Sequence, residues 1–204
     1  MLTWMQITKI GSSNVMLPAA VAIAIWLITG DARRLFLYWC LLFAGGLILV
    51  AASKIAFVGW GIGIEAIDFT GFSGHAMRSA AIIPVIFYLA LLPKAPAARW
   101  WAVLLGMCLA TLISVSRVLL QFHSISEALS GWLLGSAVCL AFVHSAENLP
   151  KPEFNRVLIA TSFAMLLAAS FTKPIPTQRL IDDAAQLLSG HPAAAAQIRS
   201  RRPD

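Results

Sequence analysis

The chain has 204 residues, of which 59% are hydrophobic and only 12% are charged. This composition excludes an ordinary soluble protein, because a domain of this length cannot hide so much apolar surface from water. The net charge of +6 does not indicate a nucleic-acid partner, since the basic residues are scattered among short loops instead of forming one stripe. Lipid headgroups are the more natural anionic partners.

Six apolar segments follow one another along the chain, separated by short polar interruptions. Each approaches the roughly 20 residues that a helix needs to cross a hydrocarbon core of about 30 Å. Backbone groups in lipid have to be satisfied within the segment, so these segments are predicted to be helices. The predicted fold class is all-α, a polytopic membrane protein built as a six-transmembrane-helix bundle. The predicted spans are about Val15 to Thr29, Leu35 to Ser53, Ala76 to Leu92, Trp100 to Leu120, Ala128 to Val143, and Val157 to Phe171.

Residues 1–172 are predicted to form the membrane domain and residues 173–204 a C-terminal tail. The tail is expected to begin with a short amphipathic helix that lies on the membrane surface, and to be disordered beyond Gly190. The apolar positions of this predicted helix are Leu180, Ile181, Ala184, Leu187 and Leu188, against the polar Arg179, Asp182 and Asp183.

Two connections between spans carry unusual polarity. One runs from Lys54 to His75, and the other from Ser116 to Glu127. An even number of predicted crossings separates them, so they are expected to open on the same face of the membrane. Charged side chains at membrane depth are costly and are therefore functional candidates. The candidates are Lys54, Ser73, His75, Arg78, Arg117, His123 and Glu127.

The remaining loops suggest an orientation. Loops one, three and five contain six basic residues without an evident chemical role: Arg33, Arg34, Lys94, Arg99, Lys151 and Arg156. The opposite face has three comparable charges: Lys9, Lys173 and Arg179. The positive-inside rule then places loops one, three and five in the cytoplasm and the two polar connections on the outer face.

The candidate residues suit a phosphoryl group. Cations neutralise its nonbridging oxygens, and Gly74 at the start of the third span offers backbone amides at a helix N-terminus. One histidine can attack while the other donates a proton. A nucleophilic imidazole needs a carboxylate at its opposite nitrogen, and His123 and Glu127 are four residues apart, neighbours on one helical face.

The segment SRVLLQFHSISE resembles the third signature of the type-2 phosphatidic acid phosphatases, in which Ser-Arg is followed by His and then by Asp. Ser116, Arg117 and His123 match, and Glu127 replaces the aspartate. FSGH resembles the second signature, with Phe72 in place of proline and with Ser73, Gly74 and His75 matching. Lys54 matches the lysine of the first signature, but Gly61 and Ile62 stand where Arg-Pro is usual.

The resemblance implies a role for each matching residue. His123 would be the nucleophile, Glu127 its orienting carboxylate and His75 the general acid. The phosphate would be held by Lys54, Ser73, Gly74 and Arg117, and our hypothesis is that Arg78 supplies the charge missing from the first signature. In-line attack would give a phosphohistidine, which is then hydrolysed. No metal or other cofactor is required, and Cys40, Cys108 and Cys139 have no spacing typical of a metal site.

The implied function is a membrane lipid phosphate or diphosphate phosphatase of a bacterial inner membrane, with a periplasmic site. An undecaprenyl diphosphate-like carrier is the first choice of substrate, followed by phosphatidic acid or phosphatidylglycerol phosphate. Two alternatives stay open: a lipid phosphotransferase that uses the same site, and a noncatalytic binder or transporter of anionic lipids. No sequence feature specifies an oligomeric state.

Overall fold

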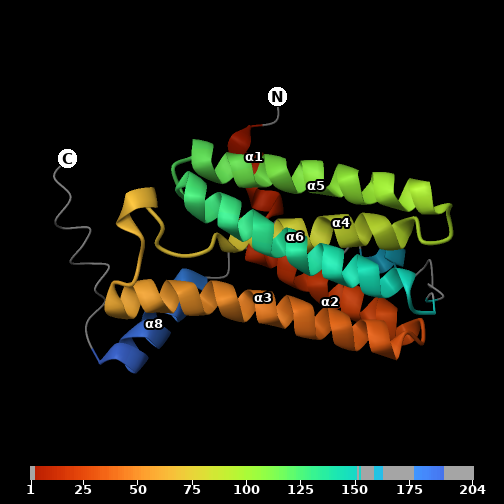
Figure 1. Cartoon of the computed structure of the whole chain (residues 1–204), viewed down its shortest axis with the longest axis horizontal. Coiled ribbons are helices and arrows are strands. Elements are labelled where there is room, and N and C mark those ends of the chain that lie inside the picture. Colours follow the sequence, from red (N-terminus) through yellow and green to blue (C-terminus); the bar gives the residue numbers. More distant parts are fainter. Residues whose placement is uncertain (1–2, 151, 153–158, 163–176, 191–204) are drawn as a thin grey trace.

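The computed structural model of the chain describes residues 3–150, 152, 159–162 and 177–190. In this part of the chain the regular structure is helical, apart from one isolated antiparallel bridge between Ile64 and Phe69. The long helices run side by side in an elongated bundle (Figure 1). In chain order the elements are α1 (Trp4–Ile10), α2 (Ser13–Thr29), α3 (Arg33–Trp60), the 3-10 helix η1 (Glu65–Ile67), α4 (Gly74–Ala90), α5 (Pro96–Leu119), α6 (Ile125–Glu147) and α8 (Thr177–Ser189).

Several of these helices are suited to a membrane. Four stretches of the described residues are long and apolar enough to cross one: Trp4–Thr29, Arg33–Trp60, Pro96–Leu119 and Ile125–Glu147. Large apolar side chains on their outer surfaces, such as Leu41, Ile48 and Trp101, are exposed. Such surfaces are stable against lipid tails and unfavourable against water. The apolar helices therefore indicate a membrane protein.

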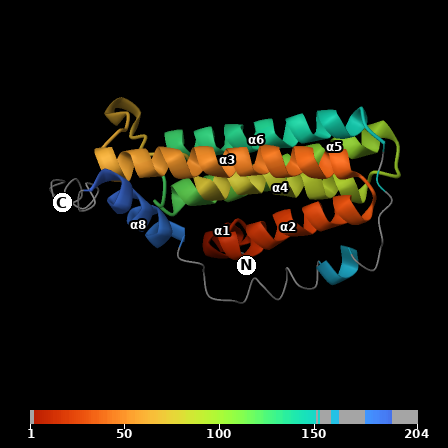
Figure 2. The same ribbon diagram turned by 90° about the horizontal axis from the view of Figure 1, so that it is seen from below.

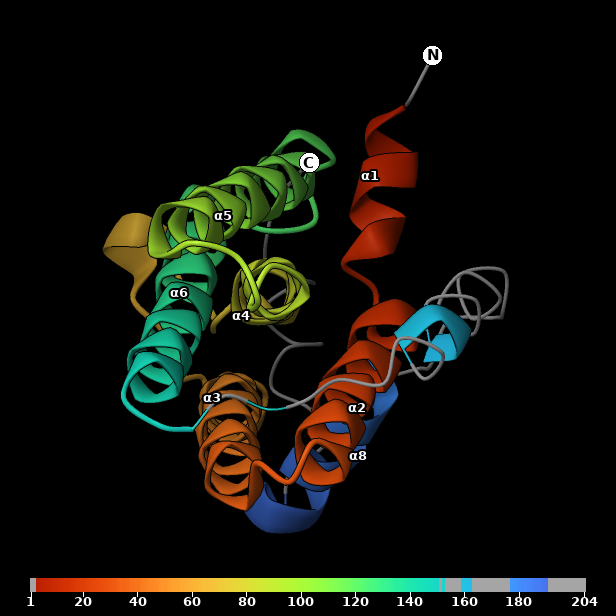
Figure 3. The same cartoon turned by 90° about the vertical axis from the view of Figure 1, so that its right-hand side faces the viewer.

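α4 lies in the middle of the bundle, surrounded by α2, α3, α5 and α6 (Figure 3). It has 17 residues, which corresponds to roughly 25 Å of helix. Nearly all of its residues are buried, including Arg78 and Ser79. Glycines let its neighbours approach closely, as is usual for helices packed in membranes. A Cβ added to Gly106 of α5 would lie 2.5 Å from the Cα of Pro84, and one added to Gly135 of α6 would clash with the backbone of Met77.

The connections are divided between the two ends of the bundle (Figure 1). The α3–α4 loop (residues 61–73) and the α5–α6 turn (residues 120–124) lie at one end, which we call the loop end. The α2–α3 and α4–α5 connections lie at the other. The two polar connections that the sequence singles out are therefore at the same end of the molecule.

α8 lies beside the part of α3 near the loop end (Figure 2). The contact involves Ala185, which is buried, and Ser189, both of which face Gly59 of α3. Leu187 and Leu188 are exposed. A helix thus forms where the amphipathic pattern predicts one, but small residues and not the leucines make its contact with α3.

The structure of the described residues confirms part of the fold that the sequence predicts. The first five predicted spans correspond to α2 to α6, and the all-α class is confirmed there. The count of six crossings is not confirmed, because four stretches of the described residues are long and apolar enough to cross a membrane, and most of the predicted span from Val157 to Phe171 lies outside the described residues. The tail beyond Gly190 and the boundary at residue 172 also lie outside them, so these stay predictions.

One correction concerns the site directly. α3 continues past Ser53 to Trp60, so Lys54 lies within a helix and not in a loop. The helix continues because the residues after Lys54 are again mostly apolar. It ends at Gly61, whose φ of +69° is a left-handed conformation that favours glycine.

The end opposite the loop end contains a buried ion pair. Arg99 is 3% exposed, and its Nη2 lies 2.9 Å from Oε2 of Glu147. The Tyr88 hydroxyl donates to the other carboxylate oxygen at 2.9 Å. These residues join α4, α5 and α6. Arg99 therefore has a structural partner, which corrects its treatment in the sequence as a loop charge without a role.

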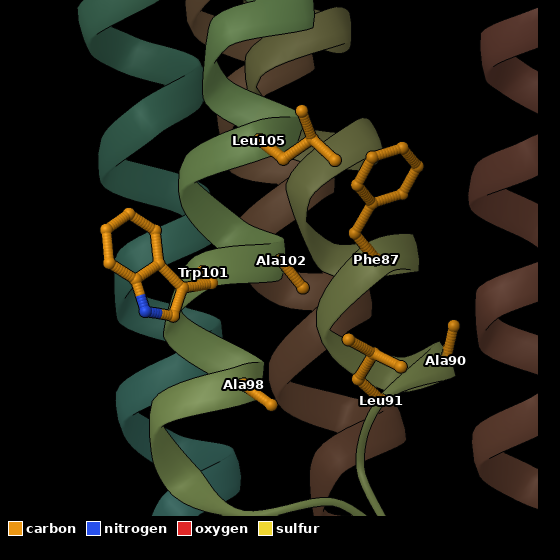
Figure 4. Close-up of a pocket in the computed structure, with 7 residues that line it drawn as sticks. All are labelled: Phe87, Ala90, Leu91, Ala98, Trp101, Ala102 and Leu105. Carbon is orange, nitrogen blue, oxygen red and sulfur yellow. The ribbon is translucent and has the colours of Figure 1, made fainter.

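A groove of about 510 Å³ also lies at that opposite end, between α4 and α5 (Figure 4). Its lining residues are all apolar and include Phe87, Leu91, Trp101 and Leu105. Because no charged side chain lines the groove, it does not offer a phosphate site. The residues that the sequence predicts to bind phosphate are instead at the loop end.

Candidate active site

His123 and Glu127 make a direct contact at the start of α6. The imidazole Nδ1 lies 2.7 Å from Oε2 of Glu127, and the two side chains are only 12% and 7% exposed. A carboxylate at this distance accepts a hydrogen bond from the Nδ1–H group and fixes the ring tautomer. The lone pair of the neutral imidazole is then on Nε2, which leaves that atom as the nucleophilic nitrogen.

Glu127 also joins the two sequence segments of the site. Its Oε1 accepts hydrogen bonds from the backbone amide of Thr70, at 3.0 Å, and from the Thr70 hydroxyl. Its backbone carbonyl accepts a hydrogen bond from the amide of Ser73 at 3.0 Å. With Ser124 it forms a capping box at the start of α6. The α3–α4 loop is therefore fastened to the first turn of α6 through one residue.

The α5–α6 turn brings Arg117 toward the same place. Gln121 adopts a left-handed conformation with φ +56°, and the amides of Phe122 and His123 donate to the Arg117 carbonyl at 3.0 and 3.3 Å. The Arg117 guanidinium carbon lies 4.4 Å from the centroid of the Phe122 ring, a cation–π contact. Its Nη1 donates to Oγ1 of Thr8 in α1 at 3.3 Å.

Lys54 lies beneath the α3–α4 loop. A Cβ added to Gly71, whose φ is +143°, would lie 3.0 Å from Cγ of Lys54, so the loop backbone passes directly over the lysine. The amide of Phe72 donates to Oγ of Ser53 at 3.1 Å. Phe72 stands where the resemblance places a proline, and a proline has no N–H for this bond. This departure from the second signature therefore has a local structural role.

Ser73, Gly74 and Arg78 lie at the start of α4. Ser73 is the fully buried N-cap residue. Arg78 is 7% exposed, and its Nη1 would lie 3.0 Å from a Cβ on Gly74, so the guanidinium folds back over the helix N-terminus. Oγ of Ser73, Nε of Arg78 and Nε of Arg117 are buried without a hydrogen-bond partner among the described residues. Buried donors of this kind are rare and need a functional or structural explanation.

Cationic groups surround His75. Four groups that are or can become positively charged act electrostatically on its imidazole: Arg117, Arg78, His123 and Lys54. Asp182 of α8 is a further charge that acts on Lys54. The two histidines and the three cations predicted from the sequence therefore lie within electrostatic range of one another. All eight predicted site residues come together at the loop end, whereas Glu65 of the same loop is exposed.

Sequence reasoning missed Thr70 and Thr8. Their partners are 57 and 109 residues away in the chain, and neither threonine belongs to a local pattern. Ser124 had a local signal, because a Ser followed three residues later by Glu is the pattern of a capping box.

This arrangement favours binding and transfer of a phosphoryl group. The cations, the buried donors and the N-terminus of α4 all attract an anion. Beside them is an imidazole with one nitrogen held by a carboxylate and the other left to react. Among the described residues, no group of three or more His, Cys, Asp or Glu side chains is placed to hold a metal ion.

Comparison with known proteins agrees with this geometry. The model of the PAP2 superfamily, the type-2 phosphatidic acid phosphatases, matches residues 65–151, a segment that contains His75 and His123. A curated relative from Klebsiella pneumoniae, described as an uncharacterized 22.5 kDa protein in the cps region, is 37% identical over 186 residues, which cover 88% of this chain and 88% of that protein. No solved structure matches the chain. The chain belongs to the PAP2 superfamily.

Proposed function

We propose that the protein is a membrane lipid phosphatase that forms a phosphohistidine on His123. Membership of the PAP2 superfamily supports a phosphatase-type activity. The proposal of a phosphohistidine on His123 rests on the 2.7 Å contact between Nδ1 of His123 and Oε2 of Glu127, which lies beside a buried cluster of cations. The substrate is a lipid phosphate or diphosphate, with an undecaprenyl diphosphate-like lipid as first choice and phosphatidic acid-like lipids next.

The first chemical step is attack by Nε2 of His123 on phosphorus. The bond between phosphorus and the leaving-group oxygen breaks as the bond between nitrogen and phosphorus forms. His75 donates a proton to the leaving oxygen, because the negative charge of the bound phosphate favours the protonated imidazole against the opposing effect of the surrounding cations. Glu127 stabilises the positive charge that develops on the attacking imidazole. The product of this step is phosphohistidine together with the released lipid alcohol or lipid monophosphate.

The second step is hydrolysis. His75, now neutral, removes a proton from a water molecule, and the water oxygen attacks the phosphorus of the phosphohistidine. The bond to Nε2 breaks and inorganic phosphate leaves. His123 returns to its starting tautomer, and His75 is again protonated for the next cycle.

The cations stabilise both transition states. Phosphoryl transfer depends mostly on positioning and on neutralising the equatorial oxygens. Lys54, Arg78 and Arg117 supply the positive charge, and Ser73 with the amide of Gly74 supplies hydrogen bonds. Arg78 is proposed to replace the arginine missing from the first signature, since it is buried, folded over Gly74 and has an unpartnered Nε in the described part of the chain.

The decisive test is a phosphate-release panel with the purified full chain in detergent. Polyprenyl diphosphate, polyprenyl phosphate, phosphatidic acid and phosphatidylglycerol phosphate are the substrates. His123→Gln is expected to lower release by roughly 10³-fold or more. His144→Gln is the matched control, because His144 is exposed in the last turn of α6. Equal release by the wild type and by His123→Gln would refute the proposal.

The covalent intermediate can be tested with ³²P-labelled p-nitrophenyl phosphate, whose leaving group needs no proton. His75→Gln is then expected to form the phosphohistidine but to hydrolyse it slowly, so label accumulates on the protein. The label is expected to be stable in alkali, labile in acid and absent from His123→Gln. Phosphate transfer only in the presence of a lipid acceptor would identify a phosphotransferase, and binding of inorganic phosphate without any turnover would identify a noncatalytic binder.

A further inference from the structure

We propose that Thr70 is a positioning residue, which holds the Glu127 carboxylate in the orientation that His123 requires. The kinetic part of this inference rests on the proposed function, whereas its structural part does not. Thr70 lies in the α3–α4 loop, outside the signature segments that the sequence singles out.

The carboxylate of a glutamate side chain rotates easily unless other groups hold it. The last torsion of glutamate is broad, so a carboxylate with one partner can turn away from it. Thr70 donates two hydrogen bonds to Oε1 of Glu127, one from its amide at 3.0 Å and one from its hydroxyl. With Oε1 fixed in this way, Oε2 is directed at Nδ1 of His123 at 2.7 Å.

The other contacts of Glu127 do not supply this restraint. The amide of Ser124 lies farther away, 3.3 Å from Oε2, which is the oxygen that His123 already uses. Ser73 binds the backbone carbonyl of Glu127 and not its side chain. Thr70 is therefore the described residue whose hydroxyl controls the rotation of the carboxylate.

Thr70 is itself held in place. Two residues beyond it, the amide of Phe72 donates to Oγ of Ser53 at 3.1 Å, and the next amide, that of Ser73, donates to the Glu127 carbonyl at 3.0 Å. The loop is thus attached to α3 on one side and to α6 on the other. A donor on a fixed backbone can orient its acceptor, which a donor on a freely moving loop cannot do.

A competing explanation is that Thr70 only docks the loop on α6. The chain offers a matched control for this. Oγ of Ser126 donates to the carbonyl of Ile67 at 2.7 Å, so it also joins the loop to the first turn of α6 through one hydroxyl. The Ser126 hydroxyl bonds Ile67 and Ser124, and not the Glu127 carboxylate. Ser126→Ala therefore removes this docking bond, together with a 2.8 Å contact to Oγ of Ser124, and leaves the two bonds from Thr70 to Glu127 in place.

The kinetic experiment compares the full-length wild type with Thr70→Val, Thr70→Ser and Ser126→Ala, using phosphate release from polyprenyl diphosphate in detergent. Thr70→Val keeps the shape of the side chain and the amide bond but removes the hydroxyl. It is expected to lower kcat by roughly 10- to 100-fold, the effect of losing one hydrogen bond to a charged group, with KM changed by about twofold or less. Thr70→Ser is expected to restore most of kcat, and Ser126→Ala to stay near the wild type.

A second measurement needs no turnover. In ¹⁵N-histidine-labelled protein, with the His123 signal assigned by its loss in His123→Gln, the neutral ring of the wild type is expected to carry its proton on Nδ1. In Thr70→Val the ring is expected to shift toward the Nε2–H tautomer, and in Thr70→Ser and Ser126→Ala to keep the wild-type form.

The two measurements separate the possible failures. A wild type without His123-dependent release refutes the proposed function, and the tautomer alone then decides the role of Thr70. The positioning role is overturned if Thr70→Val leaves the His123 tautomer unchanged, or if Ser126→Ala reproduces the effects of Thr70→Val.

Discussion

Both carboxylate oxygens of Glu127 accept hydrogen bonds. The carboxylate reaches His123 at 2.7 Å on one side and the amide of Thr70 at 3.0 Å on the other. Replacing it with Gln keeps its shape but removes the charge that stabilises a phosphorylated or protonated imidazole. We expect kcat to fall by roughly 10³- to 10⁴-fold, as happens when the carboxylate of a catalytic triad becomes an amide. Phosphate release at saturating substrate measures this.

Folding of the Glu127→Gln protein has to be checked, because Glu127 is only 5% exposed and replacing a buried residue can unfold the bundle. Helical circular dichroism and the melting temperature in detergent show whether the bundle survives. Glu127→Asp has a side chain one methylene shorter, and its kcat is expected to lie between those of the wild type and of Glu127→Gln. A folded Glu127→Gln protein with kcat within about tenfold of the wild type would exclude an orienting role for the carboxylate.

Arg78 is the buried cation that we propose takes the place of the first-signature arginine. Replacing Arg78 with Met removes a buried guanidinium whose Nε has no partner among the described residues. We expect kcat/KM to fall by roughly 10- to 100-fold, because one charge on the bound phosphate is no longer neutralised. Arg78→Lys keeps the charge and is expected to recover part of the loss. Steady-state kinetics over a range of substrate concentrations measure both variants.

Arg33 provides the comparison for Arg78. Its side chain is 83% exposed and lies 3.8 Å from Asp31 at the opposite end of the bundle, and exposed pairs of this kind contribute little to stability. Arg33→Met is expected to have the kcat/KM of the wild type. If Arg78→Met is folded and has unchanged kcat/KM, then another group replaces the first-signature arginine.

The sequence predicts some site residues and not others, for a physical reason. His123 and Glu127 are four residues apart, and Ser73, Gly74 and His75 are consecutive, so their relation is visible locally. Thr70 and Thr8 become important only through contacts formed by the folded bundle. A threonine in a polar loop has many possible roles, and nothing in the neighbouring residues selects one of them.

At the scale of helices, the position of α4 depends on close contacts with glycines of α5 and α6. A Cβ on Gly135 would clash with the backbone of Met77 and would lie 2.9 Å from Cβ of Ala80. Backbone atoms cannot move aside as a flexible side chain can. Gly135→Ala is therefore expected to lower the free energy of unfolding by roughly 1–3 kcal/mol, the usual cost of overpacking. Thermal unfolding in detergent measures the change.

Gly45 is the matched control, since it also lies in an apolar helix but a Cβ there would meet nothing within 4 Å. Gly45→Ala is expected to be neutral or stabilising by up to about 1 kcal/mol, because alanine favours the helical state. If both substitutions have the same effect, helix propensity and not the close approach of α4 and α6 governs stability.

Helix positions are easier to predict than helix ends. Long apolar runs identify α2 to α6 because lipid requires internally satisfied backbone groups. The predicted end of α3 at Ser53 is wrong because Lys54 is compatible with a helix as well as with a loop. The helix in fact continues to Trp60. The separation of α1 from α2 is equally hard to foresee, since Gly11 and Ser12 differ little from other small residues within spans. α1 turns aside there and packs on α5.

The orientation of the molecule in the membrane decides on which side the loop end, and with it the candidate site, is located. Lys54, Arg78 and Arg117 are assigned to the candidate site, so their charges are left out of the prediction of orientation. Arg33, Arg34 and Lys94 lie at the opposite end of the bundle and have no role in the site. The positive-inside rule assigns such short basic loops to the cytoplasm. We therefore propose that the loop end faces the periplasm, which would let headgroups of the outer leaflet reach His123.

Thiol labelling tests this orientation. In a variant with Cys40, Cys108 and Cys139 replaced by Ala, a single cysteine is placed at Glu65 or at Lys94, both of which are exposed. The Glu65→Cys protein is expected to react with a membrane-impermeant maleimide in spheroplasts, because its loop faces outward. The Lys94→Cys protein is expected to react only after permeabilisation, which also shows that its thiol is reactive. The reverse pattern would place the site in the cytoplasm, and its substrate would then be a lipid of the inner leaflet.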